Sequence, residues 1–109
     1  MYPEIEVRQL RCVIAVADEL HFTRAAQKLH ITQSALTRQI RHLELQLGVD
    51  LFFRGTRHVE PTDAGRALAE DGRKALLLMD RGVRRALGAG RGDFDVLRSA
   101  GWRLFRSVG

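Results

Sequence analysis

Apolar residues recur at helical spacing in the first third of the chain. Between residues 7 and 19 they stand at i, i+3, i+4 and i+7, the pattern of one buried helix face: Leu10, Val13, Ile14 and Ala17. Residues 24–29 predict a second, short helix. Thr23 is its predicted N-terminal cap, because a threonine hydroxyl can accept a hydrogen bond from an amide of the first turn.

The clearest amphipathic pattern covers residues 33–47. Its apolar residues cluster on one side of a helix drawn at about 100° per residue, and they are Leu36, Ile40, Leu43 and Leu47. Ser34, Arg38 and Arg41 fall on the opposite side, so one face belongs to the core and the other is polar and basic. Thr32 is the predicted N-terminal cap, and Gly48 suits the left-handed conformation that ends a helix.

Two very short strands around a glycine-containing turn are predicted within residues 51–60. A long helical pattern follows and runs to about residue 87, with Thr62 as its cap and Asp63 near the positive end of the helix dipole. The glycines of residues 88–92 predict a linker after this helix. In the tail beyond it, an amphipathic helix and disorder are both open interpretations.

The long helix exceeds what the small domain before it can cover, so part of its apolar stripe is expected to pair two copies of the chain. The predicted dimer contacts are Leu68, Ala75, Leu76, Met79 and Val83. A short capped helix, a turn and a longer capped helix make a helix-turn-helix, and the hairpin after it makes a wing. The expected fold is therefore mainly α: a winged helix-turn-helix with a short two-stranded wing over residues 1–61, and a dimerising linker helix over 62–87.

Charge and composition point to a polyanionic partner. The net charge is +5, and no acidic residue occurs from Leu20 through Leu43, a stretch that contains four basic side chains. The single cysteine, Cys12, excludes an internal disulfide and is expected to be a buried thiol. No secretory signal or membrane-length apolar stretch is evident, so a cytoplasmic protein is expected. The histidines show no metal-site spacing, and no catalytic motif, cofactor site or membrane contact is predicted.

Several segments together resemble the signature of LysR-type transcriptional regulators over residues 5–87. They are Phe22-Thr23-Arg24-Ala25-Ala26, Ala35-Leu36-Thr37-Arg38-Gln39-Ile40, Leu43-Glu44, Leu47-Gly48, Leu51-Phe52 and Thr62-Asp63-Ala64-Gly65, with Leu29, Gln33, Arg54 and Arg57. The resemblance implies a winged helix-turn-helix, a helix that pairs two subunits, and a DNA target with two half-sites. Leu20-His21, Ser34 and Pro61 depart from the family pattern. Residues 88–109 also depart from it, so a Gly-rich linker and tail are expected there, without an effector domain or a small-molecule effector site.

The resemblance places Gln33, Ser34 and Arg38 where family members contact bases, and Arg57 where the wing reaches the minor groove. Glutamine can pair with adenine and arginine with guanine, which agrees with these roles. Five further residues are better suited to phosphate contacts: Thr23, Thr32, Thr37, Arg41 and Arg54. The alternative interpretation is that the arginines form a solvated helix face and that Gln33 and Ser34 only support the first helical turn.

Two functions from different classes follow. The first is a bacterial, sequence-specific regulator that binds double-stranded DNA as a homodimer or higher oligomer, with helix 33–47 in the major groove and the wing 51–60 at the minor groove. The second is an interaction protein that pairs through residues 62–87 with a full-length relative and disables it. An enzyme is not expected, because no catalytic residues are apparent.

Overall fold

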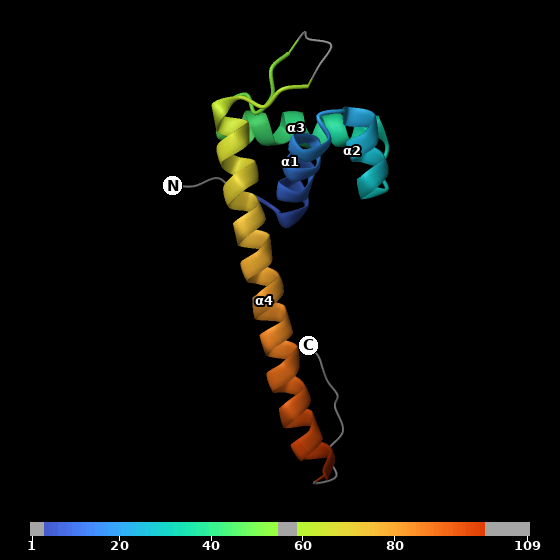
Figure 1. Ribbon diagram of the computed structural model, residues 1–109, viewed down its shortest axis with the longest axis vertical. Coiled ribbons are helices and arrows are strands. Elements are labelled where there is room, and N and C mark those ends of the chain that lie inside the picture. Colours follow the sequence, from blue (N-terminus) through green and yellow to red (C-terminus); the bar gives the residue numbers. More distant parts are fainter. Residues whose placement is uncertain (1–3, 55–58, 100–109) are drawn as a thin grey trace. The chain divides into compact units, whose positions relative to one another are not determined.

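The computed structural model describes residues 4–54 and 59–99, with side chains as far as residue 89. Over these ranges the chain forms the helices α1 (Val7–Glu19), α2 (Phe22–Leu29), α3 (Gln33–Leu47) and α4 (Asp63–Ser99) (Figure 1). The bounds predicted for the first and third helices are confirmed. The chain divides into two compact units, Met1–Leu76 and Leu77–Gly109, so the first turns of α4 belong to the helix-turn-helix unit.

The start of α2 differs from the prediction. The helix begins at Phe22, and its N-cap is His21, whose Nδ1 accepts a hydrogen bond from the Arg24 amide at 3.2 Å. The reason is the turn before it: Leu20 adopts a left-handed conformation (φ 53°) that ends α1 and leaves His21 extended as the cap. The prediction that Thr23 caps this helix is therefore wrong, because Thr23 already lies inside the first turn.

The caps of α3 agree with the prediction. The Thr32 hydroxyl accepts a hydrogen bond from the Ala35 amide at 3.0 Å. At the other end Gly48 is left-handed (φ 74°), and its amide donates to the carbonyl of Glu44. These two ends fix the length of α3, and with it the extent of the surface that α3 presents.

The core of the first unit lies between α1, α2, α3 and the segment that follows α3. Its largest fully buried side chains are Phe52, Leu36, Ile40, Leu43, Leu51, Val13 and Val16. The Phe22 ring packs edge-on against the Phe52 ring, with 6.3 Å between the ring centres. The predicted core face of α3 is confirmed, since Leu36, Ile40 and Leu43 are almost fully buried and Leu47 packs partly against them.

One pair of residues joins the two ends of segment 51–61, which contains the predicted wing. Phe52 and Pro61 form an isolated antiparallel bridge, with a hydrogen bond from the Phe53 amide to the Glu60 carbonyl at 2.9 Å. Its flanking hydrogen bonds come from the amides of Phe53 and Thr62, and the residues that the structure describes contain no further pairing, so the predicted two-stranded wing is not seen there. The predicted turn at residues 55–58 lies outside the described residues.

The helix α4 approaches the rest of its unit closely at two glycines. A Cβ atom on Gly65 would overlap the carbonyl oxygen of Leu51, and one on Gly72 would lie 3.3 Å from the Leu10 side chain. An ion pair between Arg73 and Asp18 of α1 holds the same stretch. This segment of α4 is therefore part of the packed unit, and at Gly65 the Leu51 backbone leaves no room for a Cβ atom.

Beyond Leu76, α4 continues as a regular helix to Ser99, past the end predicted at residue 87. The predicted linker at residues 88–92 is helical instead. Glycine weakens a helix by about 1 kcal/mol relative to alanine but is sterically compatible with the helical backbone, so the helix can continue through the glycines of residues 88–92. In the part of the chain that the structure describes, no helix combines the length and hydropathy needed to cross a lipid bilayer.

Candidate nucleic-acid interface

The outer face of α3 is open to solvent. Gln33, Ser34, Arg38 and Arg41 are exposed and Thr37 is partly so, and together these five side chains line a shallow depression. Ser34, Arg38 and Arg41 occupy the side of α3 away from Leu36, Ile40 and Leu43, as the periodicity predicted. The polar and basic face of this helix is therefore free to meet a ligand, because the core uses only the opposite face.

The first turn of α3 carries a small hydrogen-bonded group. Thr23 of α2 donates through its hydroxyl to Oε1 of Gln33 at 2.9 Å. The hydroxyls of Thr32 and Ser34 lie 3.2 Å apart and share a hydrogen bond. The N-terminal end of α3, whose free amides attract negative charge, thus presents polar side chains that are already oriented.

The end of α3 is tied to the start of the wing by Glu44, a carboxylate that is only 6% exposed. One of its oxygens accepts hydrogen bonds from the amides of Leu51 at 2.7 Å and Phe52 at 3.3 Å, and the other pairs with the Arg54 guanidinium. Partial burial, assisted by the charge of Arg41, lowers the pKa of Arg54 from its usual value. Arg54, predicted as a phosphate contact, is thus engaged in fixing the wing to α3.

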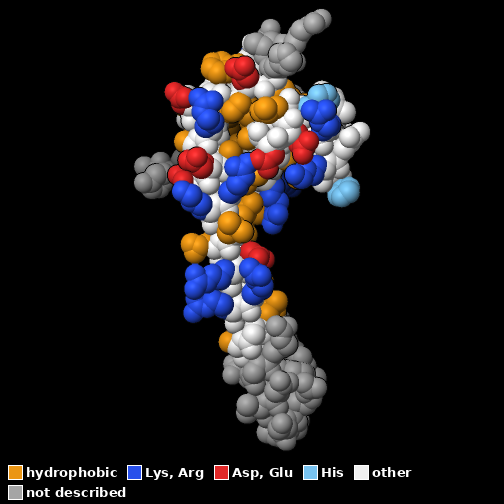
Figure 2. All heavy atoms as spheres, viewed as in Figure 1, with side chains coloured by type: hydrophobic (Ala, Val, Ile, Leu, Met, Phe, Trp, Pro, Cys, Tyr) orange, Lys and Arg blue, Asp and Glu red, His pale blue; other side chains and the backbone are white. Residues whose placement is uncertain are grey.

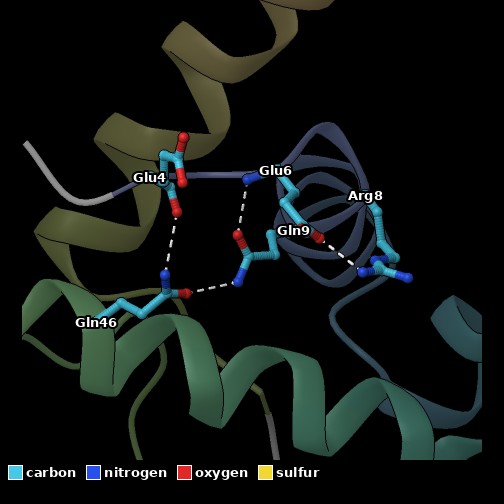
Figure 3. A network of polar contacts seen from close by, with 5 residues as sticks. All are labelled: Glu4, Glu6, Arg8, Gln9 and Gln46. Atoms are coloured by element: carbon cyan, nitrogen blue, oxygen red, sulfur yellow. Dashed lines mark hydrogen bonds and ion pairs between the residues drawn. The ribbon is translucent and has the colours of Figure 1, made fainter.

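A second polar network ties α3 to the beginning of α1 (Figure 3). The buried Gln9 side chain accepts a hydrogen bond from the Glu6 amide at 2.8 Å and donates to Oε1 of Gln46 at 2.7 Å. Gln46 in turn donates to the carbonyl of Glu4 at 3.0 Å. This network ties α3 to the beginning of α1, and Glu44 ties α3 to the segment after it. The orientation of α3 is therefore fixed by side chains outside its exposed face.

Sequence reasoning missed Glu44, Gln9 and Gln46 as functional supports. Glu44 and Gln46 read as ordinary polar residues beside an apolar stripe. Gln9 precedes Leu10 in the sequence and lies on the face of α1 that is buried in the structure. Its polar side chain on that face was the one sign of its role.

The residues predicted for dimerisation divide into two groups. Leu68 packs partly against the core of its own unit and Leu76 is half-buried, whereas Ala75, Met79 and Val83 are exposed. Three further large apolar side chains of α4 are also exposed, namely Leu77, Leu78 and Leu87. Figure 2 shows apolar and basic side chains together on this part of α4, where Arg81, Arg84 and Arg85 are exposed.

Of the other predicted site residues, Arg57 lies outside the described residues. Cys12 is buried, 3% exposed, and burial raises the pKa of its thiol, so the prediction of a buried structural cysteine is confirmed. No group of three or more metal-ligating side chains occurs within residues 4–54 and 59–99.

A short helix, a turn and a longer helix with an exposed basic face, followed by a long helix, define the class of helix-turn-helix modules. The model of the bacterial regulatory helix-turn-helix proteins of the lysR family matches residues 7–66. The chain belongs to this family, which is one of transcriptional regulators and not of enzymes.

Curated relatives agree with this assignment. The chain is 50% identical over 88 residues to the transcriptional regulator BudR of Klebsiella aerogenes, a match that covers 81% of the chain and 62% of BudR. It is 45% identical over 94 residues to TfdT of Cupriavidus pinatubonensis, covering 86% of the chain and 41% of TfdT. The chain thus spans less than two thirds of the length of either relative.

Solved structures show the same fold. The DNA-binding domain of BenM in complex with benA site 1 DNA superposes with a TM-score of 0.78 at 40% identity, covering 81% of the chain and 99% of that domain. The DNA-binding domain of CbnR in its DNA complex gives a TM-score of 0.74 at 43% identity, covering 79% of the chain and 99% of that domain. The resemblance stated from the sequence is confirmed.

Proposed function

We propose that the chain is the sequence-specific DNA-binding module of a transcriptional regulator, with α3 in the major groove of double-stranded DNA and the wing at the minor groove. The observation that carries this proposal is the exposed polar face of α3, whose arginines have no acidic partner within the described residues. The BenM and CbnR domains, which the chain resembles in fold and sequence, were solved with DNA.

The residues divide into two roles. Gln33, Ser34 and Arg38 lie near the start and middle of the exposed face and are proposed to contact base edges. Thr37 and Arg41 are proposed to contact phosphates, which position the helix without reading sequence. Three other predicted phosphate contacts, Thr23, Thr32 and Arg54, already have partners inside the unit, and Arg57 keeps its proposed role in the minor groove.

Dimerisation through α4 belongs to the same proposal. Met79 and Val83 are 43% and 51% exposed, and a helix face of this kind is normally covered in the working protein. Two copies would present two α3 helices to half-sites about one helical turn apart. Replacing Met79 and Val83 by lysine should shift the protein toward monomer in sedimentation equilibrium, whereas an unchanged mass would argue against this surface.

The test of DNA binding is a salt titration. A site selected from a random DNA pool should bind with a strong salt dependence, since each neutralised phosphate contributes about 0.9 to the logarithmic slope. Arg38→Ala should weaken binding to the selected site by about 1–3 kcal/mol. Arg84→Ala, in the second unit of the chain where Arg84 pairs with Asp80, is the matched control and should change the affinity little. Binding that is absent or independent of salt would contradict the proposal.

A further inference from the structure

The hydrogen bond between Thr23 and Gln33 joins the first turns of two helices at the exposed end of α3. Thr23 is the second residue of α2 and Gln33 is the first residue of α3, and their side-chain oxygens lie 2.9 Å apart. Both residues are exposed, so the bond is not a requirement of core packing. It lies within the group of side chains proposed to meet DNA.

The chemistry of the amide gives this bond a consequence for recognition. A glutamine amide accepts through Oε1 and donates through Nε2, and the two atoms are bonded to the same carbon. Because Oε1 accepts from Thr23, the part of the amide that is left for a ligand is Nε2. Among the side chains that the structure describes, Nε2 of Gln33 has no partner. The group that Gln33 offers to a ligand is therefore a hydrogen-bond donor.

We infer that Thr23 is a positioning residue that makes Gln33 read a base as a donor. This inference rests on the proposed function. In the major groove guanine presents two acceptors, N7 and O6, thymine presents O4, and adenine presents N7 beside a donor, whereas cytosine presents only the donor N4. The base opposite Gln33 should therefore be guanine most often and cytosine least often.

The same bond argues against a phosphate contact by Thr23. A threonine hydroxyl has a single hydrogen, and here it is donated to Gln33. A phosphate oxygen offers only acceptors, so it would have to compete with Gln33 for that hydrogen. Thr23 consequently acts on DNA recognition through Gln33.

Three variants separate these roles in selections from random DNA. Thr23→Val keeps the shape of the side chain but removes the hydrogen, so discrimination against cytosine at one position per half-site should fall by about threefold to tenfold, the effect of one hydrogen bond. Thr23→Ser keeps the hydroxyl and should restore discrimination. Gln33→Glu keeps the acceptor for Thr23 but replaces the donor by an acceptor, and it should shift the preference toward cytosine.

The double variant Thr23→Val with Gln33→Ala should show the same profile as Gln33→Ala alone, because Thr23 acts through Gln33. The salt slope of Thr23→Val should equal that of the wild type, and its thermal unfolding should show that the fold is retained. A wild-type preference for cytosine, an unchanged profile in Thr23→Val, or a salt slope reduced by about one in that variant would overturn the inference. If the wild type binds no DNA at all, the proposed function itself fails, which is a separate and visible result.

Discussion

The glycines of α4 provide a test in which the structure predicts opposite signs for the same substitution. At Gly65 a new Cβ would overlap the carbonyl oxygen of Leu51 and lie 2.9 Å from its carbonyl carbon. These are backbone atoms, and the same carbonyl accepts a hydrogen bond from the Thr62 amide at 2.9 Å. Gly65→Ala must therefore displace the junction between the wing and α4.

The magnitude follows from two opposing effects. Alanine is favoured over glycine in a helix by up to about 1 kcal/mol. Overpacking costs about 1–3 kcal/mol when side chains can adjust, and more when the obstacle is backbone. We expect Gly65→Ala to lose about 2 kcal/mol or more of unfolding free energy, which corresponds to roughly 8–16 °C in Tm for a domain of this size.

Two other glycines serve as controls. Nothing lies within 4 Å of a Cβ on Gly82, so Gly82→Ala should gain up to about 1 kcal/mol from helix propensity alone. At Gly72 the nearest atoms are the flexible ends of Leu10 and Ile14, at 3.3 and 3.5 Å, so gain and cost should nearly cancel.

The assay is thermal unfolding followed by circular dichroism at one fixed protein concentration, because association of the chain would make Tm concentration-dependent. The expected order of Tm is Gly82→Ala highest, Gly72→Ala close to the wild type and Gly65→Ala lowest. A Gly65→Ala protein as stable as the wild type would refute the close approach of α4 to Leu51.

Three further outcomes are expected from the same unit. Glu44→Ala should cost about 2 kcal/mol or more in chemical unfolding, because it leaves two amides and the Arg54 charge without their acceptor. Glu44→Gln should cost less, because its side-chain oxygen can still accept from the amides; equal costs would argue that the two amide hydrogen bonds contribute nothing. Leu20→Gly should raise stability by up to about 1 kcal/mol, since it relieves a left-handed conformation at a side chain that is 48% exposed; a loss would show that the Leu20 side chain is needed. The Cys12 thiol should react with a disulfide reagent only as the protein unfolds. Burial raises the pKa of the Cys12 thiol in the folded state. The contribution of this thiol to stability should therefore be fully present below the pKa of the unfolded state and should fall as pH rises through the folded pKa. Cys12→Ala should abolish this pH dependence.

The elements that sequence predicted well are those defined by local signals. The bounds of α1 and α3 follow from periodic apolar residues, and Thr32 and Gly48 end α3 through hydrogen bonds within four residues. The exposed face of α3 was predictable for the same reason. A residue on a strongly amphipathic helix faces either the core or solvent, and the apolar stripe decides which.

The features that were missed depend on contacts between segments. Thr23 is a good cap by residue type, but the left-handed Leu20 shifts the start of α2 and frees the Thr23 hydroxyl for Gln33. Glu44 is buried because the chain returns over it at Leu51, seven residues later. Neither event leaves a periodic trace in the sequence.

The most direct test of the central claim is methylation interference on a selected DNA site. If the exposed face of α3 enters the major groove, methylation of guanine N7 should block binding at positions about one helical turn apart, and Arg38→Ala should remove the interference at one guanine in each half-site. Interference confined to adenine N3, in the minor groove, or a pattern that Arg38→Ala leaves unchanged would contradict the account.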